Sequence, residues 1–238
     1  MESAMSSQAV ADFIDRNHDR INLVVLSRPW FHHTRQKFST SLEFALFLAW
    51  CFLWQPVSAR VTGKHASIHA VCARYGIPYM WTGDVNTQRI HALLQEKQVD
   101  LVLTCLFDQI LQEALIRIPP GGCINIHPGL LPQCRGVFPE IHTAAGKCPD
   151  FGFTVHTIEN TQIDQGRVLL KEQVVTEHRD ILSISQELLG KGLQAFEGLL
   201  EDYNTALQNA RPQAGGDYYS YPARSDLRRL KQAGYSLI

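Results

Sequence analysis

The hydrophobic positions of this 238-residue chain recur with two different periods. Spacings of three and four residues, typical of helices with one buried face, run through 9–17, 67–75, 87–98, 137–146 and 180–203. Short apolar or alternating runs, typical of strands, occupy 21–26, 77–80, 100–104, 151–158 and 167–175. Because helices and short strands alternate, the pattern predicts an α/β fold with a mostly parallel, Rossmann-like twisted sheet and helices on both faces.

Turn and cap signals divide the chain. Gly76 follows the helical pattern of 67–75 as a C-terminal cap, and Asp180 precedes that of 180–203 as an N-cap. The stretch 209–216 is polar and contains Pro and Gly. We therefore expect one domain over residues 1–208, followed by a linker and a short C-terminal arm over 209–238.

Residues 42–54, from Leu42 to Trp54, are apolar at every position except Glu43 and rich in aromatic side chains. A membrane-spanning helix needs about 20 apolar residues, so no membrane span is expected. The segment predicts a buried helix, a lid, or an apolar surface that a homodimer would cover.

Composition is that of an ordinary globular protein, with 45% hydrophobic and 19% charged residues. The formal net charge of −1 gives no basic field and is unfavourable for a nucleic-acid partner. The six cysteines contain no CxxC pair, so we expect no zinc site and mostly buried thiols. Residues 1–8 lack the apolar stretch of a signal peptide, which leads us to expect a cytoplasmic protein.

Three polar residues have complementary chemistry. Asn125 and His127 lie two positions apart on an apolar run that ends at Pro128, so both should point to one side of a strand end. An amide N–H can stabilise an oxyanion, and an imidazole with a pKa of about 6.5 can move a proton at neutral pH. Asp164, in an Asp-Gln-Gly turn, can orient the imidazole and raise its pKa. Together they suit acyl transfer, although each alone also fits a structural role.

These residues stand in a longer motif, which reads Asn125-Ile126-His127-Pro128-Gly129-Leu130-Leu131-Pro132, then Arg135-Gly136, Thr154-Val155-His156 and Asp164-Gln165-Gly166. The motif resembles that of the folate-dependent formyltransferase family, which includes glycinamide ribonucleotide, methionyl-tRNA and sugar-amine formyltransferases. The usual pattern has Ser where this chain has Gly129. The resemblance covers about residues 70–175 well. Family members usually begin with a strand that residues 1–7 are too short and polar to supply, so we expect the sheet to lack it.

The resemblance implies that 1–208 is a formyltransferase-like catalytic domain. Its reaction would be transfer of a formyl group from 10-formyltetrahydrofolate to a primary amine of a small acceptor, such as an amino sugar nucleotide, an amino acid or another biosynthetic amine, through a tetrahedral intermediate. Asn125, His127 and Asp164 would be catalytic, and no metal is implied. His156 fits either a supporting role beside them or a structural one.

The resemblance also implies a folate-binding loop after the strand at 100–104, where the family surrounds the pterin ring. Its residues here are Leu106, Phe107, Gln109, Ile110 and Leu111. An apolar slot suits a flat heteroaromatic ligand, but Phe107, Ile110 and Leu111 fit an ordinary hydrophobic core equally well.

Other functions stay open. In a 10-formyltetrahydrofolate hydrolase, water would replace the amine and the same three residues would serve. A non-catalytic folate-binding or partner-binding protein of this fold would agree with the missing strand and the aromatic segment. Acyl transfer through a cysteine nucleophile is a further alternative, because Cys123 and Cys134 flank the motif.

Overall fold

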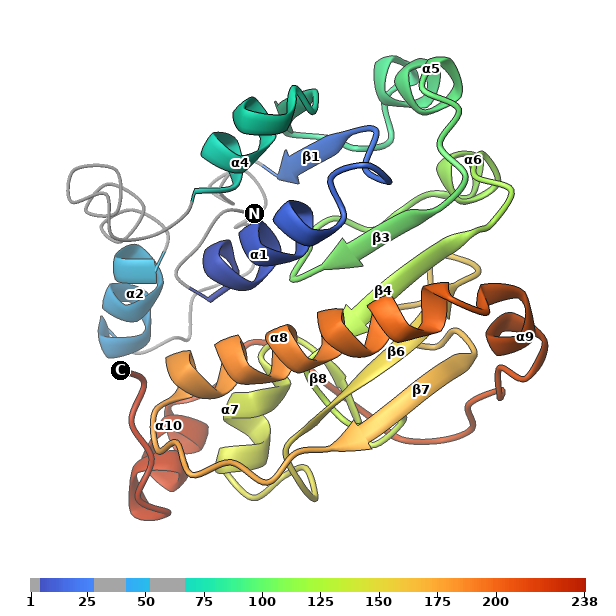
Figure 1. The fold of residues 1–238 in the computed structure, drawn as a ribbon. Helices are drawn as coiled ribbons and strands as arrows, with labels where there is room; N and C mark the ends of the chain where they lie inside the picture. The colour runs from blue at the N-terminus through green and yellow to red at the C-terminus, as the bar shows by residue number, and fades with distance from the viewer. Residues whose placement is uncertain (1–4, 28–41, 52–66) are drawn as a thin grey trace.

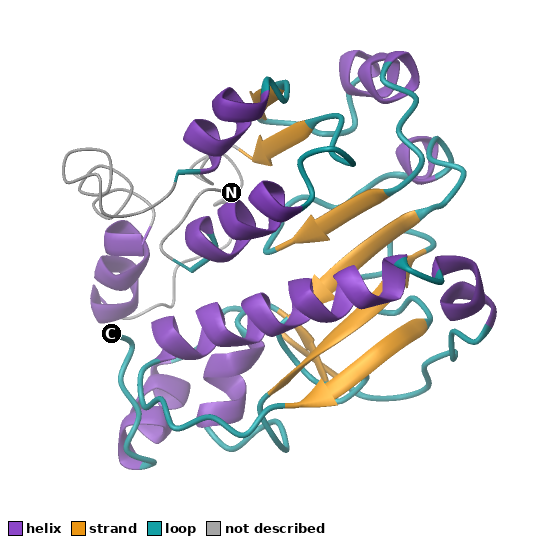
Figure 2. Ribbon diagram, viewed as in Figure 1, coloured by secondary structure: helices purple, strands orange, loops and turns teal. Residues whose placement is uncertain are grey.

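The structure is a computed structural model that describes residues 5–27, 42–51 and 67–238. It confirms the α/β class, with twisted strands covered by helices (Figures 1 and 2). In chain order the elements are α1 (Ser7–Arg16), β1 (Val24–Ser27), α2 (Leu42–Ala49), α4 (Ile68–Tyr75), β2 (Tyr79–Thr82), α5 (Gln88–Glu96), β3 (Val102–Cys105), α6 (Glu113–Ile116), β4 (Cys123–His127), β5 (Cys134–Gly136), α7 (Pro139–Ala144), β6 (Gly152–Ile158), β7 (Val168–Gln173), α8 (Ile181–Leu200), α9 (Tyr203–Gln208), β8 (Asp217–Tyr219) and α10 (Arg224–Gln232).

The described strands form a four-stranded sheet, β3-β4-β6-β7, and two pairs, β1-β2 and β5-β8. The pairs β1-β2, β3-β4 and β5-β8 are parallel, whereas β4-β6 and β6-β7 are antiparallel. The expected mostly parallel sheet therefore needs correction on its β6-β7 side, since these strands are joined by the short loop 159–167, which leaves neighbours antiparallel. Among the described strands, none connects β1 to β3.

Helices pack on both faces of β1, as predicted. Leu26 packs with Ile14 of α1 and Val71 of α4. Val25 instead packs against the cluster that contains Ile90 of α5, because successive side chains of a strand point to opposite faces.

The long helix α8 fixes the strand that carries Asn125 and His127. Asp180 begins the helix as predicted, its Oδ1 accepting a hydrogen bond from the Ser183 N–H at 2.7 Å. Gly192 lets α8 approach β4 closely, since a Cβ there would lie 2.6 Å from Ile126 Cγ2. The face of β4 opposite Asn125 is thereby buried against α8.

Within the predicted segment 42–54, α2 is a half-buried helix. Phe44 and Phe47 are buried, and the Phe44 ring meets the Phe138 ring edge-on at a centroid distance of 5.3 Å. Leu42 and Leu46 point outward, 75% and 60% exposed. Residues 52–54 lie outside the described ranges. In the part of the chain described here, no helix is long and apolar enough to cross a membrane.

The C-terminal residues pack onto the main domain. The strand β8 pairs with β5, and α10 buries Leu227 and Leu230 in the largest hydrophobic cluster. The Lys147 ammonium lies 2.7 Å from the buried Asp226 carboxylate of α10. The arm thus contributes a strand next to the segment that follows the Asn125–His127 motif.

The cysteine prediction is correct for some residues and wrong for one pair. Cys51, Cys72 and Cys123 are buried cysteines that form no disulfide. Cys134 and Cys148 instead form a disulfide, with their Cα atoms 5.7 Å apart. The turn after α7 returns the chain to β5 and brings these two residues together, and no local spacing motif signals that return.

Candidate active site

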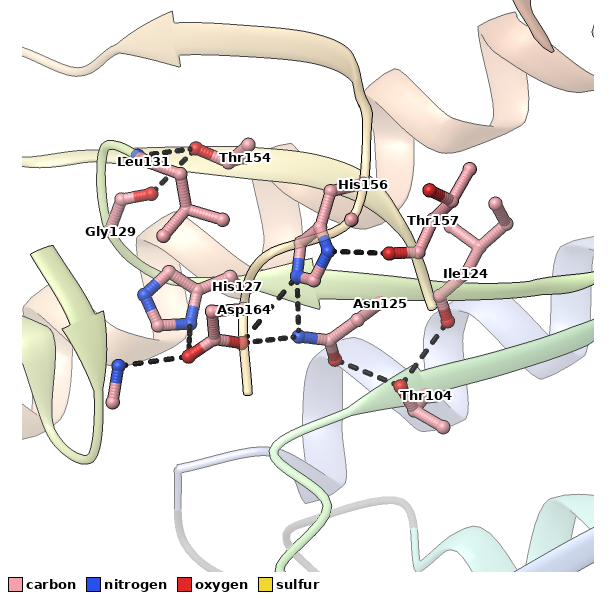
Figure 3. Close-up of polar contacts among 12 residues, drawn as sticks. Thr104, Ile124, Asn125, His127, Gly129, Leu131, Thr154, His156, Thr157 and Asp164 are labelled. Carbon is pink, nitrogen blue, oxygen red and sulfur yellow. Dashed lines mark hydrogen bonds and ion pairs between the residues drawn. The ribbon is translucent and has the colours of Figure 1, made fainter. Parts of the chain in front are cut away.

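The structure brings Asn125, His127 and Asp164 together (Figure 3). Asn125 and His127 lie on the same face of β4 at its carboxyl end, and the loop 159–167 carries Asp164 over them. Asp164 has a positive φ of 54°, a conformation that non-glycine residues rarely adopt. The Gly136 N–H donates a 2.8 Å hydrogen bond to Asp164 Oδ2 and helps to hold it there.

Glycine at position 166 shapes this loop. A Cβ at Gly166 would collide with the Thr157 carbonyl, so the loop can close against β6 only with glycine here. The Gln213 side-chain amide donates to the Gly166 carbonyl at 2.5 Å and fastens the loop to the C-terminal arm. The Asp-Gln-Gly spacing therefore places a carboxylate next to a tight backbone contact.

His127 is 4% exposed and makes two directional contacts. Its Nε2 lies 2.7 Å from the Cys134 carbonyl and its Nδ1 lies 3.6 Å from Asp164 Oδ2. Burial lowers the pKa of His127, and this outweighs the upward effect of Asp164 and the Cys134 carbonyl. The neutral ring must carry its proton on Nε2, because a carbonyl only accepts, so Nδ1 presents a lone pair beside the Asp164 carboxylate.

Asp164 is a carboxylate at neutral pH. Burial by itself would raise its pKa, but the neighbouring His127 and His156 rings and the hydrogen bond from the Gly136 N–H outweigh that effect and lower the pKa to about 2. A proton arriving on His127 Nδ1 would therefore be stabilised by an adjacent negative charge.

Asn125 is held on both sides of its amide. Its Oδ1 lies 2.9 Å from Thr104 Oγ1, and its Nδ2 lies 3.1 Å from His156 Nε2 and 3.5 Å from Asp164 Oδ1. His156 is 2% exposed and also contacts the Thr157 carbonyl through Nδ1 at 2.9 Å. His156 therefore lies in direct contact with the Asn125 amide.

A cavity of about 520 Å³ opens in front of these residues. Every residue of the predicted folate loop lines it, but their side chains differ in setting. Leu111 is buried in the core and Phe107 packs against that core, whereas Ile110 is half exposed. The Gln109 side chain accepts from the Val85 N–H at 2.7 Å and donates to Ser27 Oγ at 2.8 Å, so it joins the ends of β1 and β2 to the loop.

Several cavity residues come from segments that sequence reasoning did not connect with the site. Tyr218 and Tyr221 enter from the C-terminal arm. Glu140 of α7 also lines the cavity and is 1% exposed. Burial raises the pKa of Glu140 to about 7, although its Oε1 accepts a 2.6 Å hydrogen bond from Ser185.

The cysteine nucleophile hypothesis is wrong. Cys134 is in the disulfide, and burial raises the pKa of Cys123 to about 12, so its thiol stays protonated. Among the described residues, no group of three or more His, Cys, Asp or Glu is arranged to hold a metal ion.

Comparison with known proteins gives a consistent result. The formyl transferase family model matches residues 63–197, more than half of the chain. Methionyl-tRNA formyltransferase from Anaplasma marginale is 24% identical over 157 residues, which are 66% of this chain and 52% of that protein. This chain spans about half the length of the curated relatives it matches.

Solved structures share the fold. A sugar N-formyltransferase from a Shewanella species superposes with a TM-score of 0.53 at 20% identity, covering 90% of this chain and 87% of the other. An N-formyltransferase from Helicobacter canadensis, in complex with folinic acid and dTDP-3-aminofucose, has a TM-score of 0.54 at 14% identity, covering 90% and 80%. The matched region contains Asn125, His127 and Asp164, and this chain belongs to the formyl transferase family.

Proposed function

We propose that this protein transfers a formyl group from 10-formyltetrahydrofolate to a primary amine of a small acceptor. The observation that carries the proposal is the neutral His127 ring, whose unprotonated Nδ1 lies beside the Asp164 carboxylate. That carboxylate in turn contacts the Asn125 amide. This arrangement brings together a proton acceptor, a negative charge that stabilises its protonated form and a hydrogen-bond donor for an oxyanion.

The cavity suits a folate. Its volume of about 520 Å³ lies in the usual range for small-molecule sites. Leu106, Phe107 and Ile110 give it an apolar wall for a flat pterin ring, and Gln109 holds their loop in shape. The Helicobacter canadensis structure of the same fold was solved with folinic acid, a formylated folate.

In the proposed reaction the acceptor amine attacks the formyl carbon of the folate. The formyl oxygen becomes an oxyanion that accepts a hydrogen bond from Asn125 Nδ2. The amine proton passes to His127 Nδ1, directly or through one water, and the Asp164 carboxylate stabilises the imidazolium. The oxyanion then re-forms the carbonyl, the bond from the formyl carbon to the folate nitrogen breaks, and that nitrogen takes the proton from the His127 imidazolium, which returns the ring to its neutral form.

The acceptor that we propose is an amino sugar nucleotide, an amino acid or a comparable biosynthetic amine. The formal net charge of −1 supports a small molecule over a nucleic acid. The solved relative in complex with dTDP-3-aminofucose illustrates the first class.

The test uses absorbance to monitor the loss of 10-formyltetrahydrofolate, with and without a panel of amines. We expect turnover that requires an amine and is abolished in His127→Ala. The exposed His178→Ala serves as the matched control and should keep full activity. Turnover without any amine would replace the proposal by a hydrolase, and folate binding without turnover would replace it by a binding protein.

A further inference from the structure

Three polar side chains form a row across neighbouring strands. Thr104 of β3 is in register with Asn125 of β4, and Asn125 is in register with His156 of β6. Side chains at matching positions on adjacent strands lie on one face, within contact distance. Figure 3 shows the three side by side, with Asn125 in the middle.

The protonation of His156 decides which way the Asn125 amide points. His156 Nδ1 lies 2.9 Å from the Thr157 carbonyl, which can only accept, so Nδ1 carries the proton of the neutral ring. His156 Nε2 is then an acceptor, and the group 3.1 Å from it must be the Asn125 NH₂. Asp164 agrees, because its carboxylate oxygen 3.5 Å away would repel an amide oxygen.

It follows that Asn125 Oδ1 faces Thr104, and that the Thr104 hydroxyl donates to it at 2.9 Å. Among the described residues, Thr104 Oγ1 is the one donor to this oxygen. The hydroxyl also lies 3.2 Å from the Ile124 carbonyl, but it has a single proton and the Asn125 contact is the shorter.

One N–H of Asn125 remains available. The first N–H is used by His156, and the second faces Asp164 Oδ1 at 3.5 Å, the outer limit of a hydrogen bond. Thr104, Asn125 and Asp164 all line the cavity, so this second N–H can serve an oxygen that enters it.

We infer that Thr104 is a positioning residue, which fixes the Asn125 amide so that an N–H, and not the carbonyl oxygen, faces the reacting group. The inference rests on the proposed function. Without the Thr104 hydroxyl, the buried Asn125 Oδ1 loses its donor and the amide loses its preference between its two orientations.

The test compares Thr104→Val, which keeps the side-chain shape and removes the hydroxyl, with Thr104→Ser, which keeps the hydroxyl. We expect Thr104→Val to lower kcat about tenfold, the effect of losing one buried hydrogen bond, with the KM for 10-formyltetrahydrofolate changed less than about twofold. Thr104→Ser should recover kcat to within about threefold of wild type. Wild-type kcat in Thr104→Val, or equal losses in both variants, would overturn the inference.

A second measurement does not depend on turnover. The hydrogen exchange of the Asn125 side-chain NH₂ can be followed by NMR, with its signals assigned by their loss in Asn125→Ala. We expect exchange about tenfold faster in Thr104→Val and unchanged in Thr104→Ser. Unchanged exchange in Thr104→Val would overturn the inference. If the exchange rates change as expected but the wild type transfers no formyl group, only the proposed function is wrong.

Discussion

Gly129 stands where the related enzymes usually have Ser, and the structure indicates that this chain cannot accept a side chain there. A Cβ at position 129 would lie 2.7 Å from Pro139 Cβ, 2.9 Å from His127 Nε2 and 3.2 Å from the Cys134 carbonyl oxygen. The last two atoms are those of the hydrogen bond that holds the His127 ring. We therefore predict that Gly129→Ala impairs both stability and activity.

The magnitude follows from these distances. To restore ordinary contact, the His127 ring must move by about half an ångström, and Pro139 must move as well because its ring leaves no rotamer to change. Overpacking of this kind costs about 1–3 kcal/mol, or roughly 3–10 °C in Tm for a chain of this size. Since a misplacement of about 1 Å can cost about a hundredfold in rate, half of it should lower kcat at least about tenfold.

The assay is kcat together with Tm for Gly129→Ala and Gly129→Ser. The matched control is Gly190→Ala, because Gly190 lies in α8 and a methyl group added there would have no neighbouring atom within 4 Å. That control should keep its activity and gain up to about 1 kcal/mol of stability from helix propensity. Wild-type kcat and Tm in Gly129→Ala would refute the reasoning.

Three further predictions concern titration and covalent structure. His127 must be neutral to accept a proton, and burial lowers its pKa. The value of kcat/KM should therefore be constant through neutral pH and fall only below about pH 6.5. A fall in kcat/KM centred above that pH would contradict this. Burial raises the pKa of Glu140 from 4.5 to about 7, so the free energy of unfolding falls as pH rises through this window. In urea unfolding, Glu140→Gln should therefore raise the free energy of unfolding by about 3 kcal/mol at pH 8 and leave it unchanged at pH 4. An equal gain at both pH values would count against this prediction. The Cys134–Cys148 disulfide spans 14 residues, so Cys148→Ser should lower the free energy of unfolding by about 3 kcal/mol, and an unchanged unfolding curve would argue that the bond is not formed.

The sequence predicts those parts of the fold and site that depend on local pattern. The two-residue spacing of Asn125 and His127 places both on one face of a strand, and the periodic run after Asp180 marks α8 and its cap. Asp164 is predictable from its motif, because Gly166 has a backbone contact that only glycine allows.

The remaining features depend on which distant segments become neighbours. Thr104 acquires its contact with Asn125 from the register of two strands, and Tyr218 reaches the cavity only because β8 pairs with β5. The disulfide between Cys134 and Cys148 has the same origin. Pairing of this kind is decided by tertiary packing, and no period or turn signal in a single sequence encodes it.

The most direct test of the account is formyl transfer by Asn125→Ala, measured in a single turnover with saturating 10-formyltetrahydrofolate and an amine that the wild type accepts. If the Asn125 N–H stabilises the oxyanion, the rate of transfer should fall by about a hundred- to a thousandfold while folate affinity changes little. A transfer rate within about threefold of wild type would contradict the central role given to this amide.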